Sequence, residues 1–242
     1  MEDWDRQAPP ERLTLLAFLD DRQVDMGFHL LFHGVGKPRR ELEPGEADLW
    51  ISPSQLHETL DLIANTDVRV SVDDGNVSDL EVILPALKCR SLMATFFPIA
   101  GRIGEPGSLS ASAIRELRDE GMPIGSHGMR HRPWRRLTAD EEYEEFVVAR
   151  ERLMDVLQRP VNAAACPRGA YDRRSLRVLR RLGYSHVFTS DRGPSDPEAW
   201  IQARDSIRRW DDRDSVAAAV IRGPSAPTRL VMYGKRLIKR LR

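Results

Sequence analysis

Short apolar runs alternate with amphipathic stretches along most of the chain, and the spacing of the apolar positions separates strands from helices. Valine stands at every second position of residues 67–72, the period-2 pattern of a strand, and the apolar run 28–36 ends at glycines. Thr138 to Glu141 has the pattern of a capping box that opens a long helix. We expect further strands at residues 91–97, 123–127, 161–166 and 185–190, and further helices after Ser52, Ser78 (kinked at Pro85) and Ser110 and at residues 173–182. This alternation, without an internal repeat, predicts βαβ units and a mostly parallel α/β sheet or barrel.

Two adjacent carboxylates, Asp73 and Asp74, end the strand at residues 67–72 and are followed by Gly75. Consecutive residues in an extended chain point in different directions, so one Asp could hold a metal while the other acts as a base. Taken alone, such a pair is more often an acidic surface turn, because Asp-Gly is a common turn dipeptide.

Two histidines, His127 and His131, stand four residues apart. On a helical turn they would share one face and could bind one ion, although a lone pair of this kind is more often a solvated or packed face. With Asp74 they would form a site of two histidines and one carboxylate, which suits Zn²⁺ or another divalent first-row metal that activates water.

A third group of candidates follows later strands: Arg168 and Tyr171 lie in a loop after one strand, and Asp191 ends another. The loop alone could be an ordinary surface turn. As a set, the candidates supply what amide hydrolysis at a metal centre needs, namely metal ligands, a base, an arginine to fix the base and an acid.

Composition narrows the class of protein. In the 242 residues, Lys and Arg total 37 and Asp and Glu total 37, so a general nucleic-acid binder is not indicated. The basic cluster at residues 130–136, with Trp134 inside it, could instead line a sugar groove, because it adjoins the candidate metal histidines.

Two cysteines fit a reducing compartment, and the apolar run at residues 13–19 lacks the features of a signal peptide. We therefore expect a cytoplasmic location.

The last stretch, residues 228–242, carries six Lys or Arg and no acid, interleaved with apolar residues. This pattern predicts a basic amphipathic tail that contacts the cytoplasmic face of an anionic membrane, or else an ordinary helix flanking a barrel with a solvated charged face. We expect an N-terminal extension at residues 1–25, a barrel domain at residues 26–227 and this tail as a third part.

At this point the chain resembles the polysaccharide deacetylases, the NodB-like metal-dependent N-deacetylases of carbohydrate esterase family four. Four local matches occur in the family's order from roughly residue 28 to residue 204. Ser71 to Gly75 is similar to the family's Thr-Phe-Asp-Asp-Gly, Ala94 to Phe97 to its Ala-Thr-Phe-Phe, His127 to His131 to its His-x3-His, and Arg168 to Tyr171 to its Arg-x-Pro-Tyr, with alanine in place of proline.

The resemblance implies an α/β fold, a distorted (β/α) barrel with about seven strands, and hydrolysis of an N-acetyl group on an amino sugar of a polysaccharide or glycolipid, as in the biosynthesis of cell-surface glycans. The expected cofactor is a divalent metal ion, Zn²⁺ before Fe, Co or Ni. Asp74, His127 and His131 would be its ligands and Asp73 the general base. Arg168 would hold Asp73, the Tyr171 backbone N–H would bind the oxyanion, and Asp191 would orient the catalytic histidine.

The chain departs from the family at the last motif, Leu-x-His, whose histidine is the general acid, because no histidine follows His186. Residues 31–33 have this pattern near the start of the chain. This favours a circularly permuted branch resembling the poly-N-acetylglucosamine deacetylases, with His33 as the acid, since the first and last strands of a closed barrel are neighbours. Two alternatives stay open: His33 is a core histidine, or the chain is a catalytically inactive glycan-binding or scaffold domain on the same fold.

Overall fold

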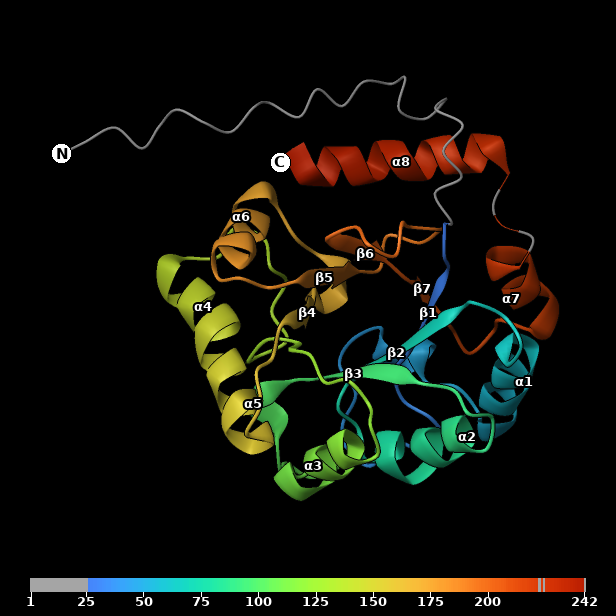
Figure 1. Cartoon of the computed structure of the whole chain (residues 1–242), viewed down its shortest axis with the longest axis horizontal. Helices are drawn as coiled ribbons and strands as arrows, with labels where there is room; N and C mark the ends of the chain where they lie inside the picture. The colour runs from blue at the N-terminus through green and yellow to red at the C-terminus, as the bar shows by residue number, and fades with distance from the viewer. Residues whose placement is uncertain (1–25, 222, 224, 242) are drawn as a thin grey trace.

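The computed structural model describes residues 26–221, 223 and 225–241, and the expected extension at residues 1–25 lies outside the described residues (Figure 1). Its strands pair in parallel in two sheets, one with the order β3-β2-β1-β7 and one with the order β4-β5-β6. The strands are β1 (His29–Phe32), β2 (Arg69–Asp74), β3 (Ala94–Pro98), β4 (Ala163–Ala165), β5 (His186–Thr189), β6 (Ile201–Ala203) and β7 (Asp205–Ser206).

The two sheets join at both edges and close into a barrel. On one side Ile124 bridges to Phe96 of β3 and Ser126 bridges to Ala164 of β4, so the expected strand at residues 123–127 is reduced to two bridging residues. On the other side β6 and β7 follow each other directly, with only Arg204 between them. With the bent β6–β7 segment taken as one strand and the bridging segment as another, the described residues form the expected barrel of about seven strands.

The helices surround the barrel, as Figure 1 shows. They are α1 (Pro53–Ile63), α2 (Leu84–Lys88), α3 (Ala111–Asp119), α4 (Ala139–Tyr143), α5 (Ala149–Leu157), α6 (Arg173–Arg181), α7 (Arg213–Val220) and α8 (Ala226–Leu241). The helices expected after Ser52 and Ser110 are confirmed, and each serine hydroxyl caps its helix by accepting the backbone N–H three residues on. Thr138 and Glu141 form the expected capping box of α4.

The segment after β2 differs from the prediction. The expected kinked helix is a π-helical turn (Asp79–Ile83) followed by α2, with Pro85 in the first turn of α2, where the missing N–H costs little. Ser78 does not cap it, since its hydroxyl accepts the N–H of Val35 at 3.3 Å instead.

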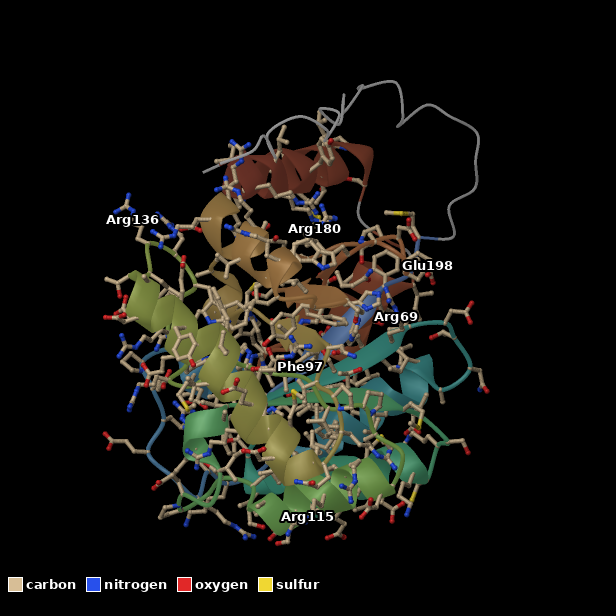
Figure 2. All side chains as sticks on the ribbon, turned by 60° about the vertical axis from the view of Figure 1, so that its left-hand side comes forward. Arg69, Phe97, Arg115, Arg136, Arg180 and Glu198 are labelled. Atoms are coloured by element: carbon tan, nitrogen blue, oxygen red, sulfur yellow. The ribbon has the colours of Figure 1, made fainter. Side chains whose placement is uncertain are left out.

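The barrel interior holds aromatic rings around the charged side chain of Arg204. Phe97 lies near the centre of the molecule, whereas Arg115 and Arg136 lie at its periphery (Figure 2). The ring of Phe97 packs 5.0 Å from that of Phe188, and the guanidinium of Arg204 lies 5.3 Å and 5.7 Å from these two rings. A buried cation in this position requires a counter-charge.

The basic tail forms α8, which runs along one edge of the barrel next to α6 (Figure 1). Lys239 forms an ion pair with Asp191, and Arg236 donates to the carbonyl of Pro194 at 3.1 Å. Leu230, Val231 and Ile238 remain exposed. Among the described residues, no helix combines the length and the apolar character that crossing a membrane requires.

Candidate active site

Asp73 and Asp74 lie at the carboxyl end of β2, in the barrel, and both are almost fully buried. The backbone turns sharply here, since Asp74 and Gly75 have φ angles of 78° and 76°. A side chain at Gly75 would also collide with Pro98, its Cβ lying only 2.8 Å from that of the proline. This turn sends the two carboxylates to different partners, as the sequence predicts.

Asp73 forms a two-pronged ion pair with Arg204, with Oδ1 2.7 Å from Nη1 and Oδ2 2.8 Å from Nη2. Burial by itself raises the pKa of Asp73, but the positive charge of Arg204 outweighs it and the pKa falls to about 2. Arg204 is completely buried and also donates to the Ser71 hydroxyl at 3.1 Å. Asp73 is therefore a fixed, ionised carboxylate.

Asp74 lies between the two histidines. Its Oδ1 is 3.6 Å from Nε2 of His127 and 3.6 Å from Nε2 of His131, and this buried oxygen has no hydrogen-bond partner. One potential ligand atom from each of the three residues lies within 4.8 Å of the others.

The partner of Nδ1 in each imidazole determines which of the two ring nitrogens carries the proton. Nδ1 of His127 contacts the Ala165 carbonyl at 2.9 Å, and Nδ1 of His131 contacts the Glu43 carboxylate at 2.7 Å. Both partners accept hydrogen bonds, so Nδ1 carries the proton and Nε2 turns its lone pair toward Asp74. Burial lowers the pKa of His127 to about 4, which keeps its ring neutral. Two imidazole Nε2 atoms and an unpartnered carboxylate oxygen fit a divalent first-row metal such as Zn²⁺.

The two histidines meet on an irregular turn and not on the expected helical turn. Gly128 and His131 have φ angles of 75° and 57°, outside the helical region, and the two imidazole rings lie 5.1 Å apart. Glu145 holds this turn by accepting the N–H groups of Met129 at 3.1 Å and Arg130 at 2.9 Å. The spacing of four residues brings the two imidazoles together, and the hydrogen bonds of Glu145 fix the conformation of the turn between them.

His33 follows β1 and lines the same cavity as the two carboxylates, His127 and His131. Burial lowers the pKa of His33, and the charges of Asp74 and Asp73 partly offset this. Its Nδ1 is buried without a hydrogen-bond partner. β1 pairs in parallel with β2 and with β7, so the strand with the Leu-x-His pattern neighbours the strand with the paired Asp, as the permuted arrangement requires.

Arg168 does not make the expected contact with Asp73. It lies in a turn at the rim of the cavity with a φ of 56°, is half-exposed, and donates from Nη2 to Glu43 at 2.8 Å. The physical reason is position: Arg204 lies inside the barrel where β6 bends into β7, and it already occupies both oxygens of Asp73.

Asp191 does not contact His33 as expected. Its carboxylate accepts the Tyr171 hydroxyl at 2.6 Å and pairs with Lys239 of α8. Tyr171 is buried, and burial raises the pKa of its hydroxyl. The oxyanion role of the Tyr171 backbone N–H stays a prediction, since neither Tyr171 nor Asp191 lines the cavity.

The cavity has a volume of about 300 Å³, and its polar lining comes from the ends of several strands and from the loop after β1. Two residues of the site were missed from the sequence, Arg204 and Glu43. In the sequence, Arg204 is only a charged residue within a short segment of alternating apolar and polar residues. Glu43 is one of several acids in a long polar loop, so neither residue stands out as a site residue.

Comparison with known proteins identifies the family of the chain. The family model described as polysaccharide deacetylase matches residues 64–187, just over half of the 242 residues. The match contains Asp73, Asp74, His127, His131 and Arg168. His33 lies before it and Arg204 after it.

Peptidoglycan-N-acetylmuramic acid deacetylase PdaA of Bacillus subtilis (strain 168) is 29% identical over 109 residues, 45% of this chain and 40% of that protein. The chain spans half or less of the length of the curated relatives that it matches.

Two solved structures share the fold. The Streptococcus pyogenes deacetylase PplD, in complex with acetate, superposes with a TM-score of 0.70 and 19% identity over 81% of this chain and 98% of that chain. IcaB from Ammonifex degensii gives a TM-score of 0.68 and 23% identity over 80% of this chain and 96% of that chain. The likeness to these structures shows the fold, and the family model covers more than half of the chain, so the chain belongs to the polysaccharide deacetylase family.

Proposed function

We propose that this chain is a metal-dependent carbohydrate N-deacetylase that removes an acetyl group from an amino sugar of a polysaccharide or glycolipid. The observation that carries the proposal is the unpartnered Oδ1 of Asp74, which faces the Nε2 atoms of His127 and His131 beside the ionised Asp73. Ligands and base thus share one cavity with His33.

The roles follow from the contacts. A divalent ion held by Asp74, His127 and His131 would polarise the acetyl carbonyl and lower the pKa of a water molecule. Asp73, held by Arg204, would take the proton of the attacking water, and His33 would give a proton to the leaving amine as the C–N bond breaks. Acetate and a free amino sugar result.

The substrate class rests on family membership and on the polar cavity. The name of PdaA points to an N-acetylmuramic acid of peptidoglycan as one test substrate. Oligomers of N-acetylglucosamine and a lipid-linked N-acetylated sugar are the other two. The alternative of an inactive binding or scaffold domain is not favoured, because the expected ligands and base converge in one cavity.

The deciding experiment combines metal analysis of the purified protein with acetate release from these three substrates. We expect about one equivalent of a first-row metal, and acetate release that a chelator abolishes and Zn²⁺ restores. A protein that takes up no metal and releases no acetate would support the binding or scaffold domain instead.

We also propose that the protein is cytoplasmic and contacts the anionic face of a membrane through α8. Leu230, Val231 and Ile238 are exposed on one side of this helix, and Lys235 is exposed among them. An apolar stripe with basic residues is the pattern of a helix that lies in a membrane interface. A lipid-linked or nascent glycan would then be presented at that surface.

A further inference from the structure

We propose that Glu43 is the positioning residue that orients His131 for metal binding and thereby determines the metal affinity of the site. The inference rests on the proposed function in one respect, that Asp74, His127 and His131 bind the metal. Glu43 belongs to the loop between β1 and α1, which the family match does not include.

The central contact is between the carboxylate of Glu43 and the imidazole of His131. Oε2 of Glu43 lies 2.7 Å from Nδ1 of His131, although 88 residues separate the two in the chain. Because a carboxylate only accepts, the contact places the proton on Nδ1 and directs Nε2 at Asp74, 3.6 Å away. A histidine that binds a metal is held in this way by the partner of its other nitrogen.

His131 depends on this contact more than His127 does. Nδ1 of His127 donates to the Ala165 carbonyl, part of β4, so the barrel itself holds that ring. His131 lies on the irregular turn with a φ of 57°, and its side chain is about 10% exposed against 2% for His127. The Glu43 side chain therefore orients the His131 ring, as the backbone carbonyl of β4 orients the His127 ring.

Glu43 is itself held in place from several sides. Its carboxylate pairs with Arg102, which follows β3, and Oε2 accepts Nη2 of Arg168 at 2.8 Å. Its backbone N–H donates to the Glu46 carboxylate at 2.8 Å. Burial by itself raises the pKa of Glu43, but its contacts with His131, Arg102 and Arg168 outweigh this and hold the pKa below its usual range, so the carboxylate is ionised. A charged acceptor fixed by two arginines is a rigid support for an imidazole.

The test compares Glu43→Ala and Glu43→Gln with wild type. The control is Glu41→Gln, which removes the same charge from an exposed residue of the same loop. Dissociation constants for Zn²⁺ and Co²⁺ are measured by chelator competition, and the visible spectrum of the Co²⁺ protein reports ligand geometry. We expect affinity to fall about 100-fold for Glu43→Ala and about 10-fold for Glu43→Gln, which keeps an acceptor oxygen, with an altered Co²⁺ spectrum. The Glu41→Gln control should match wild type.

A double-variant cycle separates positioning from a general effect on folding. In a His131→Ala background, which already lacks the ligand, Glu43→Ala should lower metal affinity no further. In the metal-free protein, long-range ¹H–¹⁵N NMR should show the Nδ1–H tautomer of His131 in wild type and a mixture in Glu43→Ala.

Two outcomes would overturn the inference: wild-type metal affinity in Glu43→Ala, or an equal loss of affinity with and without His131. Both leave the proposed function intact as long as wild type binds metal and releases acetate. Failure of wild type itself to bind metal would refute the proposed function instead.

Discussion

Asp73 and Asp74 are neighbours in the chain, and the structure gives them unlike surroundings. Asp73 has both oxygens on Arg204, while Asp74 keeps one buried oxygen without a partner between two imidazoles. Removing one member of a buried ion pair leaves the other charge uncompensated in a medium that solvates it poorly. Asp73 and Arg204 should therefore behave as a unit.

We expect Arg204→Met to lower the free energy of unfolding by about 3–5 kcal/mol, because it strands the buried charge of Asp73. The double variant Asp73→Asn/Arg204→Met should recover most of that loss while remaining without turnover. Urea unfolding and acetate release measure the two effects. Losses in stability that simply add would show that the pair is not coupled.

For His33→Ala we expect a fall in kcat of about 10²–10⁴-fold with metal content unchanged, because a proton donor is lost and no ligand is removed. The matched control is His186→Ala, at the amino end of β5 and away from the cavity, which should leave kcat unchanged. A normal kcat in His33→Ala would place the acid elsewhere.

At the scale of elements, the candidate site residues lie at the ends of short strands and on irregular turns, and these turns set the orientation of their side chains. The turn that carries His127 and His131 depends on Glu145, which lies in the π-helical turn Glu144–Val148 between α4 and α5. Its carboxylate accepts three N–H groups, including that of the Trp134 ring at 3.2 Å. Gly128 is required there, since a Cβ would collide with the Glu145 carboxylate. Hydrogen bonds to a buried carboxylate thus hold the two histidines together, in place of the helical turn that their spacing suggested.

Glu145→Ala should lower the free energy of unfolding by about 3 kcal/mol or more, since buried N–H groups lose their acceptor, and should weaken metal binding as the turn relaxes. The neighbouring Glu144 pairs with the exposed Arg130, so Glu144→Ala should cost less than about 1 kcal/mol and spare metal affinity. Thermal unfolding and metal titration check both. Equal effects of the two substitutions would contradict the role given to Glu145.

At the scale of the whole molecule, α8 contacts the barrel with one side and is exposed on the other. Its inner side reaches the turn behind the site, because Lys239 pairs with Asp191 and also donates to the Gly169 carbonyl at 3.1 Å. Its outer side carries the exposed stripe of Leu230, Val231 and Ile238. The tail is thus both a flanking helix of the barrel and the surface proposed to meet a membrane.

We expect the full chain to sediment with vesicles that contain anionic lipid and much less with neutral vesicles, because the stripe joins apolar and basic groups. The double variant Leu230→Ser/Ile238→Ser should lose most of this binding. Met93→Ser, an exposed apolar residue distant in sequence from α8, is the control and should bind as wild type does. Equal sedimentation of all three proteins would remove the membrane proposal.

The sequence by itself determined the alternation of strands and helices from β1 to β5, the capping box of α4, and five candidate residues that line one cavity: Asp73, Asp74, His127, His131 and His33. These depend on local signals, namely apolar periodicity, capping residues and short motifs, which a linear reading detects. The pairing of β1 with β7 agrees with the expectation that a closed barrel makes its first and last strands neighbours.

Only the tertiary structure decided which partners these groups have. Arg204 reaches Asp73 across 131 residues and Glu43 reaches His131 across 88, and nothing in the local pattern marks either one. Arg168 and Asp191 had the right residue types in the right order, yet they contact Glu43, Tyr171 and Lys239. The reason is physical: motifs bring reactive groups to one edge of the barrel, but hydrogen bonds and ion pairs form by distance in space, which the closure of the barrel sets.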